Sequence, residues 1–395
     1  MFRFTHSLLP SLLVAALVQV SPAFGADAES DALDLESAPV VAPKQSARDT
    51  KIFAEGAIGV VSQRYGLGSN SLSRFSIDIS HTARLSAGWR AVISDRLDQI
   101  HPRDPAGADE TVNSLREAYL SWQPEGGSSL VQFGRINLRY GPGYGYNPTD
   151  FFRDGSLRAV TTADPFALRE NRLGSVMLRA QSTNNRDRGL IALGTKFSQS
   201  VSSQLLLYKQ GGLPPALGAN MTVLVSDAAT AHLEWSRGKE PSLLSRAMVL
   251  NALPVTRNRF VGGVTYTTLG KLSLTAEYQY NGFGTSKADW GALAGTPGIQ
   301  LSYLRESLRL QELAARQAFL LYITQKGFGL KDLDLTAYIR FNPNDNSRLA
   351  WVELRHHWSN FDLTLQYQRN IGSSTSEFGI LPDRRIIQVL GTYYF

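Results

Sequence analysis

The sequence lacks several features that would point to common classes of protein. It contains no cysteine among its 395 residues, so no disulfide can contribute to its stability. After residue 25 its longest apolar stretches are as short as AFLLYI (318–323), whereas a membrane-spanning helix needs about 20 apolar residues. The formal net charge of +6 is small and spread along the chain, so the charge does not indicate a nucleic-acid-binding protein.

Histidine is also scarce, and this argues against most catalytic and metal sites. The chain has six histidines, and none lies in a recognisable catalytic motif. His356 and His357 are adjacent on a predicted strand and therefore point to opposite faces, which is poor geometry for a shared metal. The sequence predicts no enzyme, no cofactor and no metal site.

The first residues have the pattern of a secretory signal peptide. Arg3 is followed by an apolar stretch from Leu8 to Val20, and Ala23 and Gly25 place small residues before a cut at Ala26. We therefore predict that residues 1–25 are a signal peptide. A buried N-terminal helix is the alternative.

Residues 26–50 have no sustained period, with acidic residues clustered before two prolines. This composition predicts a flexible periplasmic N-terminal segment. A small plug that folds into a lumen is the alternative.

From residue 51 onward the dominant hydrophobic period is two. In SLSRFSIDIS (71–80), Phe75, Ile77 and Ile79 share one face, and the residues between them are polar. KLSLTAEYQY (271–280) and FDLTLQYQR (361–369) alternate in the same way. Alternation of this kind is typical of half-buried β-strands, so the sequence predicts an all-β fold.

Three features favour a membrane barrel over a soluble sandwich, which would alternate similarly. Many predicted strands are about ten residues long, the length that a tilted strand needs to cross a bilayer. Tyrosine and tryptophan, such as Trp89, Trp122 and Tyr393, lie near strand ends. Charged residues lie on the polar faces, as a water-filled interior permits. We predict a closed antiparallel transmembrane β-barrel over residues 51–395, because an open sheet edge cannot be satisfied in lipid.

The connections set the predicted number of strands. Our count is 18 strands, with 16 as the alternative, and the least certain stretch includes a predicted strand at 244–253. The longest connections follow the predicted strands 84–98, 128–140, 271–281 and 360–370, all of which are odd-numbered. Long loops therefore lie on one side of the meander and short turns on the other, as in outer-membrane proteins.

The last strand resembles the C-terminal signature of bacterial outer-membrane β-barrel proteins. The chain as a whole resembles the porin-like members of this class. The sequence ends in Phe395, and Tyr393, Gly391, Val389 and Ile387 precede it at alternating positions. The resemblance implies a Gram-negative outer membrane, and in that family the signature implies recognition by the barrel-assembly machinery. It also implies contact with outer-membrane lipid and lipopolysaccharide, and a homotrimer is one assembly that it allows.

The densest motif of the chain lies in the stretch 134–174. Residues GPGYG (141–145) break regular structure and are followed by several aromatic residues. GPGYG lacks the lysine and the following helix of a nucleotide-binding loop. Porins fold a long extracellular loop back into the barrel, and the length and position of 141–172 resemble that loop. We predict either a constriction loop of this kind or a surface loop folded on itself.

Strand parity assigns charged residues to the predicted lumen. The basic residues predicted to line it are Arg90, Arg96, Arg135, Arg139 and Arg179. The acidic residues predicted to line it, or to lie on the loop, are Glu117, Asp150, Asp154, Asp164 and Glu170. Opposed charges across a narrow passage would create a transverse field that selects polar solutes. The alternative is that arginine–carboxylate pairs serve only to stabilise the interior.

Two classes of function follow from this interpretation. The first is a porin-like channel for passive diffusion of small polar or anionic solutes. The second is an export or assembly barrel for a polymer, a lipid or other surface material. Outer-membrane proteases of the omptin type would need paired aspartate and histidine residues, for which Asp95 and Asp98 near His101 are a weak candidate.

Overall fold

The structure is a computed structural model, and it describes residues 49–66, 68–101, 110–123, 131–157, 160–179, 188–198, 200–250 and 252–395. The predicted signal peptide and nearly all of the predicted N-terminal segment lie outside these residues. In the described part of the chain, no helix is both long enough and apolar enough to span a membrane.

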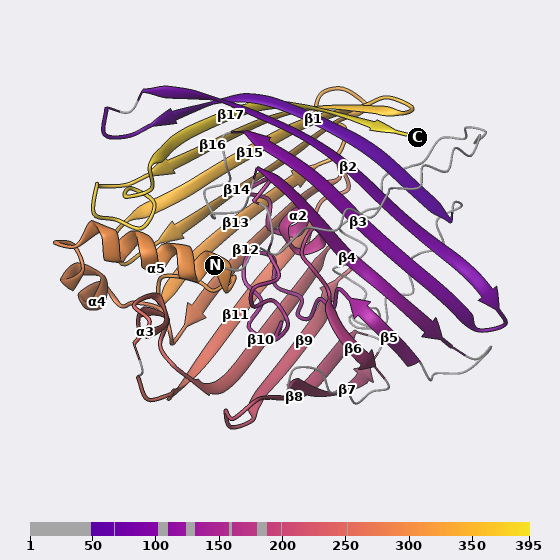
Figure 1. Ribbon diagram of the computed structural model, residues 1–395, viewed down its shortest axis with the longest axis horizontal. Coiled ribbons are helices and arrows are strands. Elements are labelled where there is room, and N and C mark those ends of the chain that lie inside the picture. The colour runs from indigo at the N-terminus through magenta and orange to yellow at the C-terminus, as the bar shows by residue number, and fades with distance from the viewer. Residues whose placement is uncertain are drawn as a thin grey trace, which may run out of the picture.

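One large antiparallel sheet dominates the molecule (Figure 1). Its strands are β1 (Thr50–Gln63), β2 (Ser69–Ser86), β3 (Trp89–His101), β4 (Thr111–Trp122), β5 (Val131–Ile136), β6 (Ser175–Arg179), β7 (Arg188–Ser198), β8 (Val201–Gln210), β9 (Ala216–Ser226), β10 (Ala229–Glu240), β11 (Val255–Thr267), β12 (Leu272–Asn281), β13 (Gln317–Gln325), β14 (Leu333–Asn342), β15 (Ser347–His357), β16 (Phe361–Ile371) and β17 (Asp383–Tyr394). In the described part of the chain, four helices accompany the sheet: α2 (Pro165–Glu170), α3 (Leu243–Ala247), α4 (Lys287–Ala292) and α5 (Pro297–Arg309).

Antiparallel pairing continues without a break from β7 to β17, from β17 to β1, and from β1 to β6. The predicted pairing of the first and last strands is confirmed, with Ile58 opposite Val389. Because every step in this series reverses direction and the series contains seventeen strands, β6 and β7 at its two ends run in the same direction. The residues between β6 and β7 lie outside the described part.

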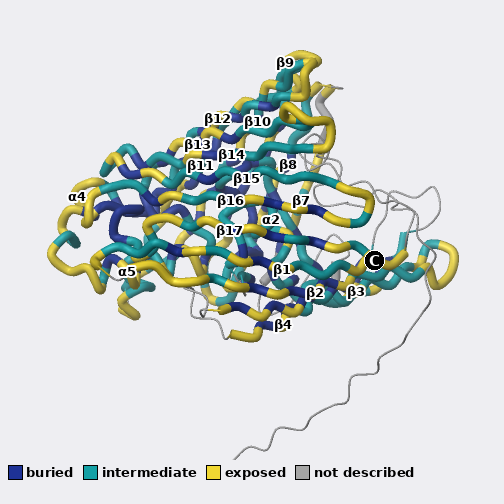
Figure 2. The backbone as a smooth tube through the Cα atoms, turned by 90° about the horizontal axis from the view of Figure 1, so that it is seen from above, coloured by how far each residue is buried: buried dark blue, intermediate teal, exposed yellow. Residues whose placement is uncertain are grey.

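The two faces of the sheet differ in the way that the sequence predicts. On β2, Phe75, Ile77 and Ile79 are exposed, whereas Ser76 and Asp78 are buried. The same alternation of exposed and buried residues is visible along β16 and β17 in Figure 2. We call the two sides the apolar face and the polar face. Apolar side chains point away from the interior, and polar side chains are enclosed.

The connections also separate into two kinds, as predicted. Long segments such as 137–174, 241–254, 282–316 and 372–382 lie at one end of the strands, which we call the loop end. Short turns such as 227–228 lie at the other end, the turn end, where β1 begins and β17 finishes.

The predicted strand at 244–253 is wrong, because this stretch contains α3. The hydroxyl of Ser242 accepts a hydrogen bond from the backbone N–H of Ser245 at 3.2 Å and caps the helix. Leu243 is buried in a cluster with Phe283, Trp290 and Tyr303, which lie in or beside α4 and α5. Figure 1 shows these three helices gathered at the loop end. Sequence analysis assigned no helices to this region.

Candidate functional site

The candidate site is the segment 137–174, which follows β5 and lies against the polar face of the sheet. Its apolar residues Phe151 and Phe152 pack on Tyr208 of β8, with the Phe151 and Tyr208 rings stacked at 4.6 Å. Leu206 and Ile136, on the same face, belong to the same cluster. The segment thus covers a part of the polar face where the strand side chains are themselves apolar.

Two buried glutamates of the sheet bind the backbone of the motif GPGYG. The Glu234 carboxylate, on β10, accepts hydrogen bonds from the backbone N–H of Gly143 at 2.6 Å and the side-chain amide of Asn147 at 2.9 Å. The Glu277 carboxylate, on β12, accepts from the N–H groups of Tyr144 at 2.5 Å and Gly145 at 3.0 Å. Charge-assisted hydrogen bonds of this kind are about twice as strong as neutral ones. The motif therefore binds carboxylates of the protein's own sheet.

The glycines of the motif are required by this close approach. A Cβ on Gly141 would stand 2.3 Å from the Glu234 carboxylate, and Gly141 also has φ of +91°. A Cβ on Gly145 would stand 2.5 Å from the side-chain nitrogen of Gln279. A larger residue at either position requires the loop, or the buried side chains of Glu234 and Gln279, to shift.

Neighbouring polar side chains hold Glu277 in place. His232 lies 2.8 Å from Glu277 through its Nε2, and the Gln279 amide donates to the same carboxylate at 2.8 Å. The guanidinium of Arg340, on β14, donates to the carbonyl of Gly145 at 2.5 Å. Side chains on the polar face of three strands, β10, β12 and β14, therefore bind the motif.

Near the loop end, the segment is bound to the helical connection 282–316. The guanidinium of Arg153 pairs with Glu312, and the Tyr146 hydroxyl donates to Glu312 at 2.5 Å. Arg259 of β11 pairs with the same carboxylate at 3.0 Å. Burial opposes ionisation of Glu312, but Arg153 and Arg259 outweigh it and lower its pKa to about 2. Glu312 therefore stays ionised and joins three elements.

The helix α2 begins in the middle of the segment and packs on aromatic residues. The carboxylate of Asp164 accepts from the N–H of Phe166 at 3.1 Å and caps the helix. The Phe166 ring contacts Tyr144 and Tyr322 edge-on, at 5.0 and 5.5 Å between ring centres. Burial, reinforced by the charge of Glu353, raises the pKa of Asp164 to about 7.

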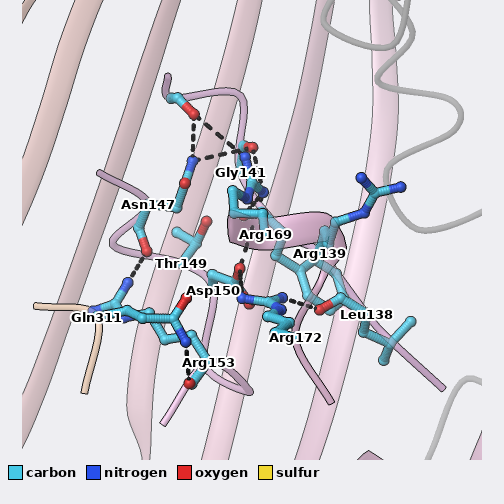
Figure 3. Close-up of polar contacts among 12 residues, drawn as sticks. Leu138, Arg139, Gly141, Asn147, Thr149, Asp150, Arg153, Arg169, Arg172 and Gln311 are labelled. Carbon is cyan, nitrogen blue, oxygen red and sulfur yellow. Dashed lines mark hydrogen bonds and ion pairs between the residues drawn. The ribbon is translucent and has the colours of Figure 1, made fainter. Parts of the chain in front are cut away.

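At the base of the segment, arginines pair with acids of the same loop. Figure 3 shows Arg172 between the carboxylate of Asp150, at 2.8 Å, and the carbonyl of Leu138. Arg169 lies 3.9 Å from Asp150 and donates to the carbonyl of Tyr140 at 3.1 Å. Burial lowers the pKa of Arg169 to about 10, so this side chain still carries its charge at neutral pH.

A buried ionic network lies on the polar face of β1 to β4. Arg96 pairs with Asp98 at 2.9 Å, with Glu55 at 3.2 Å and with Asp78 at 3.6 Å. Arg116 pairs with Asp78 at 2.5 Å and donates to Asn171 at the end of the loop segment at 2.9 Å. The predicted lumenal residue Arg96 is thus fully paired with carboxylates.

The other predicted basic residues lie in three different settings. Arg90 is on the polar face at the turn end, directly opposite Arg84. Arg139 is partly exposed and lies 3.5 Å from Glu170. The backbone of Arg179 pairs with that of Gln132. In contrast to the sequence assignment, the register places Arg135 opposite Ala118, on the face of the exposed Phe133.

The predicted acidic residues do not face a common arginine wall. Glu117 lies on the polar face of β4 and accepts from the N–H of Asn137 at 3.2 Å. Asp154 pairs with Arg309 of α5 at 3.2 Å. Asp150, Asp164 and Glu170 bind the loop's own arginines or helix, as described above.

The weak protease candidate is not assembled by the fold. Asp95 and His101 share the parity of Leu97 on the apolar face of β3, whereas Asp98 is buried on the polar face. No group of three or more histidine, aspartate or glutamate side chains suited to a metal occurs within the described ranges.

Sequence analysis missed the role of Glu234 and the pairing of Glu277 with the loop. The sequence did contain a signal: Glu234 and Glu277 each lie among the polar residues of a strand, and a glycine-rich loop occurs elsewhere in the chain. Backbone N–H groups freed by glycines need acceptors, and a buried carboxylate needs donors.

Comparison with known proteins gives only a structural likeness. No family model matches the sequence, and no curated protein matches it. Among solved structures, a triple mutant of the porin of Rhodopseudomonas blastica is similar at 12% identity and a TM-score of 0.45, covering 88% of this chain and all of that one. Another mutant of that porin is similar at 11% identity and a TM-score of 0.46, with the same coverage. Likeness at this level does not establish a relationship, and the fold is described by its own strand pairing as one continuous antiparallel β-sheet.

Proposed function

We propose that the sheet closes as a barrel of sixteen strands in the outer membrane of a Gram-negative bacterium. Because β6 and β7 run in the same direction, they together fill one position between β5 and β8, which gives the even number that a closed antiparallel barrel needs. The apolar face then meets lipid and the polar face encloses water. This closure leaves no unpaired sheet edge in the membrane.

Within this barrel, we propose a channel for small polar or anionic solutes, narrowed by the segment 137–174. The supporting observation is the binding of GPGYG to Glu234 and Glu277, which fixes the segment against β10 and β12 at the depth of the strands. Solutes would pass between this segment and the opposite wall of the barrel.

The charge preference of such a channel would come from unpaired arginines. Arg84 and Arg90 face each other on the polar side at the turn end, and within the described residues no carboxylate lies within ion-pair distance of either. Arg96, by contrast, is neutralised by three carboxylates. We therefore assign a weak anion preference to the Arg84–Arg90 pair.

Planar-bilayer recording of the purified protein tests this proposal. A channel gives stable open steps, and the variant Glu234→Gln with Glu277→Gln gives larger or noisier steps because the segment is released. The control Glu170→Gln should give the same steps as the wild type, because its carboxylate is exposed and touches neither strand β10 nor β12.

A second function is favoured by the contacts at the loop end. The connection 282–316 binds the segment through Arg309, Gln311 and Glu312. A barrel closed in this way would suit export of a polymer, lipid or other surface material. Bilayers in which the wild-type protein is silent, and the Glu312→Gln variant conducts, would favour export over passive diffusion.

A further inference from the structure

Three arginines stand on the apolar face of the sheet at the loop end. They are Arg348 on β15, Arg369 on β16 and Arg385 on β17, and all three are exposed. Arg369 and Arg385 have the parity of the exposed apolar residues Leu365 on β16 and Ile387 and Val389 on β17. Arg348 lies on the same face because its cross-strand partner Ile371 has the parity of Arg369. These arginines therefore point out of the barrel wall.

The register brings two of these charges directly together. Arg369 is the cross-strand partner of Arg385, and Arg348 is the partner of Ile371, which places it diagonally beside Arg369. Side chains directly opposite on one face have Cβ atoms about 4.5–5.5 Å apart, and like charges there destabilise the sheet. Arg385 donates to the hydroxyl of Ser62 at 3.2 Å. Across the described ranges, no carboxylate lies within ion-pair distance of any of the three arginines.

Immediately below the arginines the wall is apolar. Tyr367 lies opposite Ile387, and Leu365 lies opposite Val389, at the next positions of the same face. A ligand for this surface must therefore carry negative charge at one end and hydrocarbon at the other. A free anion satisfies only the first condition.

The two ends of the apolar face differ in charge. At the loop end, β10 also carries the outward-facing and exposed Arg237 and Lys239. At the turn end, the same face carries Trp89 and Trp122, whose rings lie 6.3 Å apart. Within the described strands, no outward-facing position at the turn end is a lysine or an arginine. The two membrane leaflets that the barrel meets should differ in the same sense.

We propose that Arg348, Arg369 and Arg385 bind the phosphate groups of a phosphorylated, acyl-chain-bearing lipid of the outer leaflet. The phosphate would lie between Arg369 and Arg385 and relieve their repulsion, because guanidinium groups bind phosphate through two parallel hydrogen bonds. The acyl chains would lie along Leu365, Ile387 and Val389. This inference rests on the membrane barrel proposed above and names its lipid partner.

The test compares thermal unfolding of the detergent-solubilised protein with three additions: bisphosphorylated lipid A, dephosphorylated lipid A and inorganic phosphate. The wild-type midpoint should rise by several degrees with the bisphosphorylated lipid only. The double variant Arg369→Gln with Arg385→Gln should lose that rise. The control Arg384→Gln should keep it, because Arg384 is also exposed but has the parity of the buried Gln388 on the other face.

A second measurement keeps the test informative if a variant folds poorly. Without added lipid, Arg369→Gln alone should leave the midpoint unchanged or raise it, because one of two opposed charges is removed. A fall of several degrees would mean that the arginines stabilise the protein without a ligand, and would overturn the proposal. Equal shifts with phosphorylated and dephosphorylated lipid, or a shift with inorganic phosphate, would overturn it as well. Failure of the membrane barrel itself would instead appear as a protein that stays soluble without detergent.

Discussion

The carboxylate of Glu234 fills the space that a side chain on Gly141 would need, with 2.3 Å between that carboxylate and an ideal Cβ. Glycine and glutamate are far apart in the sequence and mutually dependent in the fold. The glycine permits the approach, and the glutamate satisfies the backbone N–H groups that follow it.

Gly141→Ala should therefore displace the loop from the sheet. The new Cβ meets the Glu234 carboxylate, and a non-glycine residue at φ of +91° is strained by about 1–3 kcal/mol. We expect a lower unfolding midpoint in detergent and a higher channel conductance. Gly212→Ala is the matched control, because a Cβ there meets nothing within 4 Å. Equal behaviour of the two variants would contradict the close fit.

Glu277→Gln should weaken the loop by losing acceptor sites. Glu277 accepts from two backbone N–H groups and from the Gln279 amide, and it also contacts His232. A glutamine offers one oxygen acceptor, so at least one buried donor is left unpaired, at a cost of about 1.5–3 kcal/mol. Chemical denaturation in detergent measures this loss. Glu170→Gln removes an exposed ion pair, which should cost about 0–1 kcal/mol.

Arg90→Glu should shift ion preference toward cations. It gives a negative charge to one of two arginines that face each other at the turn end and have no carboxylate within ion-pair distance among the described residues. The reversal potential in a salt gradient reports this shift. Arg135→Gln, on the apolar face, should leave the reversal potential unchanged. A shift in Arg135→Gln but not in Arg90→Glu would invert our assignment of the two faces.

The stability of the protein should fall as pH rises from about 4 to about 8. Burial raises the pKa values of Asp164 and of Glu377 to about 7, each further raised by a neighbouring acid. A group with a raised folded-state pKa contributes stability that is present below its unfolded pKa of about 4 and is lost as pH passes the folded value. Asp164→Asn keeps an N-cap acceptor and should flatten the curve in part, and adding Glu377→Gln should flatten it further. An unchanged midpoint between pH 5 and 8 in the wild type would refute this prediction.

Much of the sheet could be predicted because the alternation of apolar and polar residues along a strand indicates which face each residue occupies. Phe75, Ile77 and Ile79 had to be sheltered from water by something other than the polar side of the same strand, and the exposure of each residue follows this parity. The pairing of β1 with β17 followed from the need to satisfy every backbone group at the sheet edges.

The sequence analysis assigned Arg135 to the polar face because β5 carries the apolar Ile136 on that face and the charged Arg135 on the other. Ile136 and Tyr208 pack under the loop segment, so the side of the wall that the loop covers is apolar. The alternation of charged and apolar residues along a strand cannot distinguish an apolar face that is covered by a loop from one that meets lipid. The prediction depends on where the loop lies, which the strand residues alone do not report.

The strand predicted at 244–253 was wrong, and the three helices at the loop end were not predicted, for a related reason. Leu243 and Trp290 are buried by residues of other connections, so their environment is set by tertiary contacts. The stretch has no alternation of period two, and the cap at Ser242 was the local signal for a helix.

The pairing of β1 with β17 has a consequence for biogenesis. Tyr394 is matched with Phe53, and the N–H of Phe395 donates to the carbonyl of Ile52 at 3.1 Å. These contacts join two strands that are far apart in the sequence, so β1 and β17 cannot pair with each other until both have been synthesised. Until β1 and β17 meet, each presents a row of unpaired backbone groups to which a strand of another chain can add, so the chain is exposed to aggregation during this interval.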